Sequence, residues 1–221
     1  MRKLILASLV LGLILSATSV DARKPQRQSA NPSAIIAAEL AFAKLAQAKG
    51  QWTAFRTTST PDAEMFVPQR VRAKDWLKGR ADPAVSDKWQ PHQVWSSCDG
   101  TFGVTRGAWQ RPDGVGYFTT VWQRQKKGGY KWILNQGDAL STPMPAPEMI
   151  SAKIAECRGI ATAAVTMIMP NPTRNESYGN SVDDSLKWYS GVEPSRKREF
   201  VVKIWIGSKY EIVIDATVAA R

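Results

Sequence analysis

The stretch GYFTTVWQRQKKGGYKWILNQGD, residues 116–138, decides the fold. Two runs rich in aromatic and β-branched residues flank a basic tip that contains Gly128 and Gly129. Such runs favour strands, and a short connection that contains glycine favours a hairpin. The stretch therefore predicts two antiparallel strands joined by a tight turn.

The same period-two pattern continues upstream of this hairpin. The segments HQVWSSCDG (92–100) and FGVTRGAWQRPDG (102–114) also alternate, and turn signals stand at Asp99-Gly100 and Pro112-Asp113-Gly114. Glycine and proline supply the backbone angles that such turns need. Residues 92–138 therefore predict a four-stranded antiparallel meander.

The segment before the meander is helical in pattern. Within residues 33–50, one face repeats at helical spacing and is formed by Ile35, Ala38, Phe42 and Leu45. Asn31 is a suitable N-cap, Pro32 suits the first turn, and Gly50 ends the pattern. Shorter helices are expected in QWTAFRTTS (51–59) and RAKDWLKG (72–79). Together these segments predict an α+β fold in which a curved antiparallel sheet packs on N-terminal helices.

A proline-rich stretch, STPMPAPEM, suggests a boundary, and we place a linker at 141–150. Residues 151–221 are expected to form a β-rich C-terminal extension. It is predicted to start as a helix, to turn into a strand near 163–169, and to continue as a polar loop over 171–185. A hairpin turning at Gly207-Ser208 should follow. The extension either continues the first sheet or packs beside it.

The N-terminus has the pattern of a cleavable signal peptide. Arg2 and Lys3 precede an apolar run from Leu4 to Leu15, which is short for a membrane span. We expect cleavage after Ala22, a flexible leader over 23–32, and no integral membrane segment in the mature chain. The expected location is the periplasm or the medium outside the cell.

Cysteine content and charge add two further expectations. In an oxidising compartment Cys98 and Cys157 favour one disulfide, the alternative being two separate buried thiols. The formal net charge is +11. An excess of positive charge favours anionic partners, but the basic residues are scattered along the chain, so solubility is the simpler interpretation and nucleic acid is not an expected partner.

Residues 33–139 resemble the nuclear transport factor 2-like superfamily. The resemblance rests on AELAFAKLAQAKGQWTAF (38–55), TPDAEMFVP (60–68), RAKDWL (72–77), GVTRGAWQ (103–110) and the 116–138 hairpin. The sequence looks most similar to a bacterial branch of exported proteins of unknown function, related to ketosteroid isomerase and polyketide-cyclase-like proteins. The resemblance implies a cone-shaped domain over 33–140 whose cavity serves as an active site, a ligand pocket or a dimerisation surface.

Isomerase chemistry needs a carboxylate base, with hydrogen-bond donors at the developing oxyanion. The resemblance places that base on the extended piece after the second helix, where this sequence has the apolar run Met65 to Pro68. It also implies a tyrosine on the first helix, and residues 34–49 contain none. Asp62 is expected in a turn and Glu64 in solvent. These departures disfavour the isomerase reaction.

Candidate site residues follow from position alone. Asp138, at the end of the last meander strand, is the weak candidate for a pocket carboxylate. His92 is the only histidine, so we expect a surface residue, no metal site and no cofactor. A cavity lined by aromatic strand residues would suit a flat apolar or sugar-like ligand, the alternative role being core packing; these residues are Trp95, Trp109, Tyr117, Trp122 and Trp132.

Three functions are compatible with this pattern. The first is a non-catalytic exported protein whose cavity binds a small ligand or a partner. The second is an enzyme of the isomerase or hydrolase type that uses a rearranged carboxylate such as Asp138. The third is a homodimeric scaffold of the cell envelope, because members of the superfamily often dimerise through the open face of the sheet.

Overall fold

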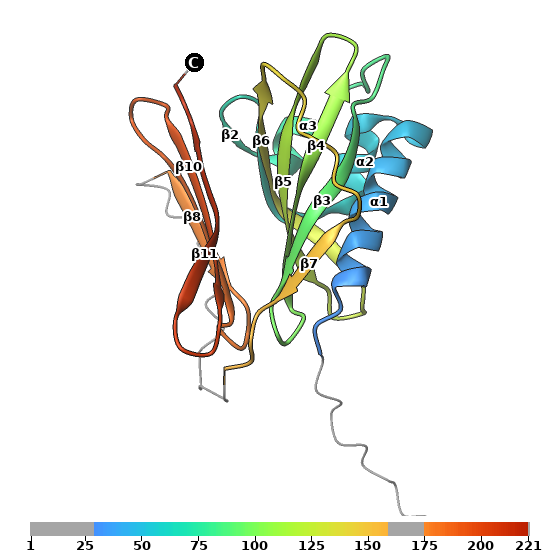
Figure 1. Ribbon diagram of the computed structural model, residues 1–221. Coiled ribbons are helices and arrows are strands. Elements are labelled where there is room, and N and C mark those ends of the chain that lie inside the picture. The colour runs from blue at the N-terminus through green and yellow to red at the C-terminus, as the bar shows by residue number, and fades with distance from the viewer. Residues whose placement is uncertain (1–28, 159–174, 221) are drawn as a thin grey trace, which may run out of the picture.

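The computed structural model describes residues 29–158 and 175–220. Figure 1 shows three layers: helices cover one face of a large sheet, and a second sheet covers the other face. The described helices are α1 (Pro32–Lys49), α2 (Gln51–Thr58) and α3 (Ala73–Leu77). The expected α+β class with a β-rich C-terminal extension is confirmed.

The large sheet has seven strands in the order β2-β1-β6-β5-β4-β3-β7. Its strands are β1 (Ser59–Phe66), β2 (Arg70–Arg72), β3 (Lys88–Ser96), β4 (Phe102–Arg111), β5 (Gly114–Arg124), β6 (Tyr130–Leu140) and β7 (Ser151–Ile154). The second sheet has four antiparallel strands in the order β11-β10-β9-β8. These are β8 (Glu176–Asn180), β9 (Leu186–Val192), β10 (Arg198–Trp205) and β11 (Tyr210–Val218).

Helix α1 begins and ends where its capping residues predict. The side chain of Asn31 accepts a hydrogen bond from the backbone N–H of Ala34 at 3.1 Å, and Gly50 ends the helix with φ at +103°. Positive φ is readily adopted by glycine because it has no Cβ. The buried face of α1 is Ile35, Glu39, Phe42 and Ala46, so the helix is rotated slightly from the face predicted by its apolar residues.

The predicted meander is confirmed in β3 to β6, whose neighbours are all antiparallel. The sheet as a whole is mixed, which differs from the antiparallel sheet expected. Strand β1 pairs in parallel with β6, and β7 pairs in parallel with β3. The pairing of β1 with β6 reaches only to Met65 opposite Asn135. The remainder of that edge of β6 therefore has no neighbouring strand among the described residues.

Two predictions for the C-terminal extension are wrong. Residues 151–154 form strand β7 and not a helix, because they pair with β3 and the backbone N–H of Ala155 continues the ladder to Ser96 O at 2.9 Å. The expected polar loop contains strand β8, which pairs with β9. The hairpin of β10 and β11 is confirmed. The signal peptide, most of the leader and the strand expected near 163–169 lie outside the described residues.

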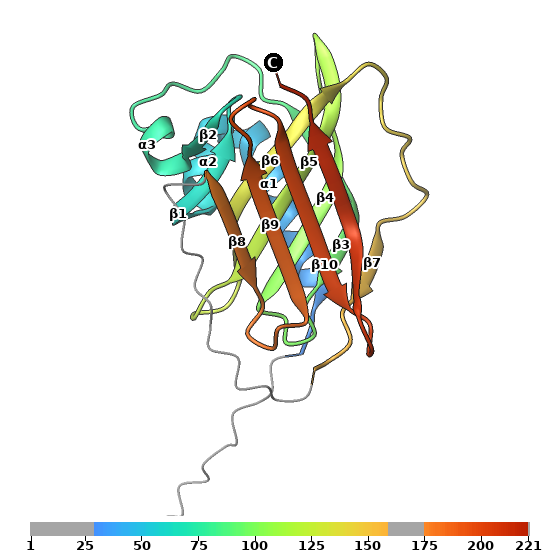
Figure 2. The same ribbon diagram turned by 90° about the vertical axis from the view of Figure 1, so that its left-hand side faces the viewer.

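The four-stranded sheet does not extend the large sheet; it packs face to face against it, as Figure 2 shows. A continuous apolar core fills the space between the sheets. The large sheet contributes Trp95, Phe102, Val104, Val121, Ile133 and Leu134, and the second sheet contributes Leu186, Trp188, Phe200, Val202, Ile204, Ile214 and Ala216. A separate core lies under the helices around Phe42, Trp122 and Trp132.

A partly buried ion pair of the large sheet contacts the second sheet at the β2 edge. Arg70 pairs with Glu64 at 2.8 Å and also contacts Ser177 and Ser190 of the second sheet, donating to the backbone oxygen of Ser190 at 2.9 Å. Glu64 is therefore not the solvated residue that the sequence suggested. Charge-assisted hydrogen bonds from the partly buried Arg70 thus join the two sheets at this edge.

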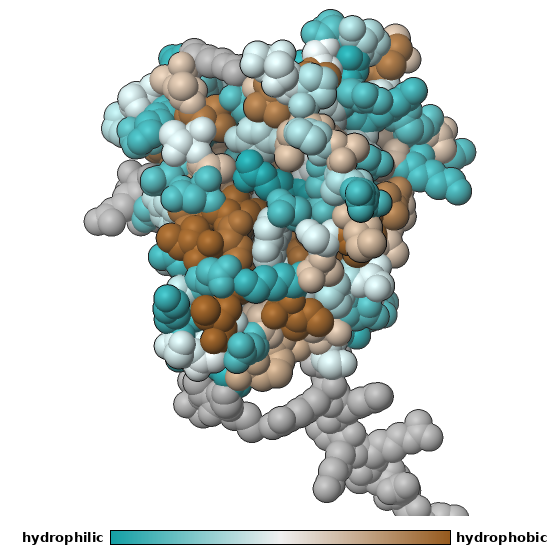
Figure 3. Space-filling view, viewed as in Figure 1, coloured by the Kyte–Doolittle hydropathy of each residue, from teal (hydrophilic) through white to brown (hydrophobic). Residues whose placement is uncertain are grey.

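The edge strands β7 and β11 meet along one side of the sandwich. Lys153 on β7 and Glu211 on β11 form an ion pair at 2.9 Å across the gap between the sheets. Ile154 and Ile212, on the same two strands, are about half exposed. Figure 3 shows this side of the molecule, with the larger apolar patches in the lower half of a surface that is otherwise mostly hydrophilic.

Cys98 and Cys157 form the expected disulfide, with Cα atoms 5.1 Å apart and a separation of 59 positions in sequence. It joins the loop after β3 to the segment after β7, where the chain leaves the large sheet. Among the described residues, no helix combines the length and apolar character that crossing a bilayer requires.

Replacing both cysteines, Cys98→Ser with Cys157→Ser, should lower the free energy of unfolding by about 4 kcal/mol, because the crosslink restricts a long loop in the unfolded chain. Urea denaturation of the variant and the wild type measures the difference. Wild type denatured under reducing conditions should match the variant, and equal stability of all three samples would show that the crosslink does not form.

Candidate functional site

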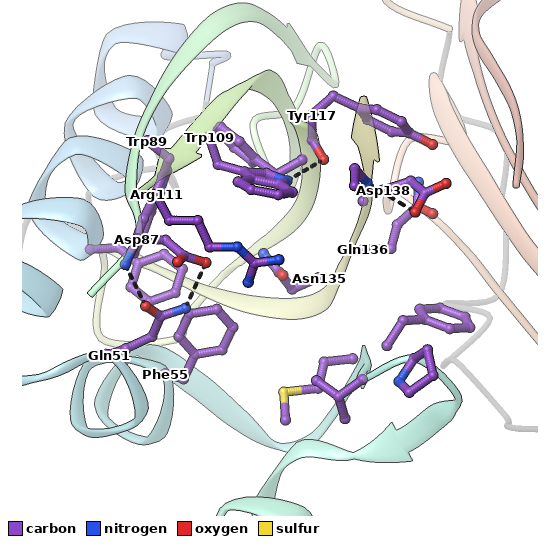
Figure 4. Close-up of a pocket in the computed structure, with 18 of the residues that line it drawn as sticks. Gln51, Phe55, Asp87, Trp89, Trp109, Arg111, Tyr117, Asn135, Gln136 and Asp138 are labelled. Atoms are coloured by element: carbon purple, nitrogen blue, oxygen red, sulfur yellow. Dashed lines mark hydrogen bonds between the residues drawn. The ribbon is translucent and has the colours of Figure 1, made fainter. Parts of the chain in front are cut away.

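A cavity of about 310 Å³ lies between α2, the end of β1 and the last residues of β6. Its volume is at the lower end of the range for small-molecule pockets. Figure 4 shows that side chains reach it from both sides of β6. Its lining comprises Phe42, Gln51, Trp52, Phe55, Met65, Phe66, Val67, Pro68, Asp87, Trp89, Trp109, Arg111, Tyr117, Phe118, Asn135, Gln136, Gly137, Asp138, Ala139 and Arg198.

The wall on the helix side of β6 is mainly aromatic. The ring of Phe42 makes edge contacts with Phe55 and Trp89, each with centroids 4.8 Å apart. The indole of Trp109 lies over Gly116, its partner on β5, where an added Cβ would stand 2.3 Å from the ring. Its Nε1 donates to the backbone oxygen of Tyr117 at 3.1 Å. Edge-to-face packing and this hydrogen bond hold the wall in one shape.

Four polar side chains lie among these aromatic rings, as Figure 4 shows. Gln51 and Asp87 hold each other: the Gln51 amide donates to the carboxylate at 3.1 Å and accepts from the Asp87 backbone N–H at 2.7 Å. The guanidinium of Arg111 lies 4.8 Å from the Trp109 ring centroid. Asn135 donates to Thr120 Oγ1 at 3.0 Å. The part of the cavity on the helix side of β6 is therefore an apolar cleft with a few fixed polar groups, as in ligand pockets generally.

The other side of β6 faces the second sheet. Tyr117 and Asp138 are cross-strand partners, and the alternation along β5 and β6 places both on the face opposite to Trp109, as Figure 4 shows. Arg198 of β10 donates to the backbone oxygen of Gly137 at 3.1 Å, and Asp138 accepts from the Ala139 N–H at 2.9 Å. The C-terminal extension thus contributes directly to the lining.

Tyr117 is held between charged neighbours. The guanidinium of Arg106 lies 4.7 Å from the centroid of its ring. Burial raises the pKa of the Tyr117 hydroxyl, Arg106 and Arg198 lower it, and Asp138 raises it. Because burial is the largest of these influences, the phenol stays protonated at neutral pH and can donate a hydrogen bond.

A buried carboxyl group on α1, outside the cavity lining, holds the aromatic wall in place through a hydrogen bond from Trp89. Glu39 of α1 is fully buried and accepts hydrogen bonds from Trp89 Nε1 at 2.7 Å, Thr105 Oγ1 at 2.6 Å and Trp122 Nε1 at 3.0 Å. Burial raises the pKa of this carboxyl, while the bonds from Thr105, Trp89 and Trp122 lower it. Glu39 does not line the cavity, so it acts on the pocket by fixing Trp89.

The candidate residues from the sequence lie in three different environments. Trp109, Tyr117 and Asp138 line the cavity. Trp95 is buried in the core between the sheets, and Trp122 and Trp132 are buried in the core under the helices. The indole of Trp132 donates to Thr58 Oγ1 at 2.9 Å. Trp95, Trp122 and Trp132 therefore have the core-packing role that the sequence left open as the alternative.

Sequence reasoning missed several residues at the site. Glu39 carried a usable signal, because it stands four residues after Ile35 and three before Phe42, on the buried face of the helix. Gln51, Asp87 and Arg198 gave none, because their meeting depends on tertiary structure. His92 also differs from expectation: it lies in β3, is 5% exposed, and burial lowers its pKa.

Within the described part of the chain, no group of three or more His, Cys, Asp or Glu residues is placed to hold a metal ion.

No family model and no curated protein matches the sequence. Among solved structures, the chain is similar to a "putative ketosteroid isomerase" from Parabacteroides distasonis, with 19% identity, a TM-score of 0.39, and coverage of 52% of this chain and 98% of the other. It is also similar to an NTF-2-like protein of unknown function from Burkholderia xenovorans, with 16% identity, a TM-score of 0.35, and coverage of 52% and 89%.

The substitution Glu39→Gln should change how stability depends on pH. The raised pKa means that, as the pH increases above the ordinary value of 4.5, the unfolded chain loses the Glu39 proton before the folded protein does. The unfolding free energy of the wild type should therefore fall relative to that of the variant until the raised pKa is passed. Urea denaturation of both proteins from pH 4.5 to pH 8 checks this, and a difference that is constant across the range would contradict it.

Proposed function

We propose that this protein is an exported, non-catalytic binding protein whose cavity takes a small, flat, apolar ligand. The single observation that carries the proposal is the aromatic wall formed by Phe42, Phe55, Trp89 and Trp109 around an open space of about 310 Å³. Aromatic rings present a large apolar surface to the cavity, and burial of a flat apolar molecule against this surface is favourable.

The distribution of acids supports a binding role over proton transfer. The end of β1, where the family resemblance implies a base, lines the cavity with Met65, Phe66, Val67 and Pro68. The one acid on the buried face of α1, Glu39, is engaged by three donors below the wall. On the aromatic side of β6, Asp87 is held by Gln51. A base that removes a proton from carbon has to face the substrate.

Export is part of the same proposal. The pattern of Arg2, Lys3 and the apolar run that follows supports cleavage after Ala22. The disulfide between Cys98 and Cys157 is compatible with an oxidising compartment.

Naphthalene is a suitable probe, because it is flat, apolar and free of hydrogen-bonding groups. We expect it to bind the wild type, and Trp109→Ala to weaken binding by about tenfold or more, since the indole supplies a large part of the wall. Isothermal titration calorimetry with the protein in the syringe measures the affinity. The matched control is Trp205→Ala, which removes a tryptophan from outside the lining and should leave the affinity unchanged; an equal loss in both variants would contradict the proposal.

A second candidate function is an enzyme of the isomerase or hydrolase type that uses Asp138. One observation favours it: Asp138 and Tyr117 line the cavity on the same face of the sheet. Asp138 supplies a carboxylate there, and Tyr117 supplies a protonated phenol. A carboxylate and a hydrogen-bond donor on opposite sides of a carbonyl compound are the elements of enolisation.

This candidate predicts proton exchange at carbon. Wild-type protein in D₂O should incorporate deuterium next to the carbonyl of an enolisable ketone such as 2-tetralone faster than buffer, and Asp138→Asn should abolish the gain. Nuclear magnetic resonance follows the exchange. Background rates with the wild type, together with binding of naphthalene, would leave the non-catalytic function as the only one supported.

The scaffold function has less support. The second sheet covers the face of the large sheet on which a homodimer of this superfamily was expected to form. A dimer would therefore need another surface, and light scattering of the purified protein at high concentration measures whether one forms.

A further inference from the structure

On the face of the large sheet that packs against the second sheet, one row of residues is apolar and the next row is polar. Trp95, Val104, Val121 and Leu134 are successive cross-strand partners on β3 to β6 and form an apolar row in the core between the sheets. The next row on the same face is polar, and it runs through Gln93, Arg106, Thr119 and Gln136. The row is exposed at Gln93 and becomes buried between the sheets at Thr119 and Gln136, where polar groups need partners.

Two members of this polar row are buried and lack such partners. Thr119 is fully buried and Gln136 is 4% exposed. Neither Thr119 Oγ1 nor Gln136 Nε2 has a hydrogen-bond partner within the described residues. An unsatisfied buried donor destabilises the folded state, so each such group in a native protein calls for an explanation.

Gln136 is also part of the cavity lining, on the side of β6 that faces the second sheet. Beside it are Tyr117, whose phenol is a donor, and Arg198 of the C-terminal extension. The amide of Gln136 can turn about its terminal bond, whose torsion is broad, and so present its N–H to a group in the cavity. This side of β6 therefore offers donors next to the carboxylate of Asp138, whereas the other side offers mainly aromatic rings.

We propose that the polar side of the cavity is a subsite for a hydrogen-bond acceptor of the ligand, a carboxylate or carbonyl group, which Gln136 binds through its side-chain amide. The inference rests on the proposed binding function and names the ligand class: a flat apolar ring system that carries one acceptor group. The ring system occupies the aromatic side, and the acceptor reaches past the free edge of β6. Arg198 makes the C-terminal extension a part of this subsite.

The probes are naphthalene and 2-naphthoate, which share the ring system and differ by one carboxylate. The wild type should bind 2-naphthoate more tightly than naphthalene. In Gln136→Leu the preference for 2-naphthoate should fall by about tenfold or more, as expected for loss of a hydrogen bond to a charged group, while the affinity for naphthalene stays within about twofold of wild type. Calorimetry measures both affinities.

If Gln136 only stabilised the fold, Gln136→Leu would lower the melting temperature and would weaken the binding of both probes. Removing an unpartnered buried amide should leave the melting temperature unchanged or raise it, so Gln136→Leu is expected to fold; Gln136→Met, of similar length, is the second variant. The matched control is Gln123→Leu on β5, outside the lining. A preference for 2-naphthoate that survives in both Gln136 variants overturns the subsite. Failure of both compounds to bind the wild type overturns the proposed function, and this inference with it.

Discussion

The structure depends on one constraint: both faces of the seven-stranded sheet are apolar and have to be covered. The helices cover one face around Phe42, Trp122 and Trp132. The other face carries large residues such as Trp95 and Phe102, and the four-stranded C-terminal sheet covers them. Exposing an apolar face of this size would cost far more than a single domain can tolerate. The C-terminal sheet is therefore needed for the stability of the whole chain.

The cavity is a consequence of the same arrangement. Strand β1 leaves β6 at Asn135, and the residues of β6 beyond that point have a free edge between the helical layer and the second sheet. Because side chains alternate along a strand, the residues of β5 and β6 point to opposite sides: Asn135 lies on the side of the aromatic wall, and Tyr117 and Asp138 lie on the side of the second sheet. One cavity therefore contains two kinds of surface, and the C-terminal extension contributes to the second through Arg198.

Much of the fold could be predicted from the sequence, because local signals determine it. The caps at Asn31 and Gly50, the glycine turns and the alternating strands each act over a few residues. Strand β7 was missed because four residues carry too little pattern, and their pairing with β3 is a distant contact. The site was predicted less well. Trp95 and Trp109 look alike in sequence, and only the register of β3 and β4 shows that they lie on opposite faces. Gln136 gave no signal, since its environment depends on the second sheet.

The distribution of the nine tryptophans has a practical consequence for spectroscopy. Trp52, Trp89 and Trp109 line the cavity, whereas Trp95, Trp122 and Trp132 are sealed in two cores. Light emitted by the first set responds to an occupant that touches the indoles, and light from the second set responds to water entering on denaturation. The chain thus contains built-in optical reporters for occupancy and for unfolding, which single-tryptophan variants can separate without any attached dye.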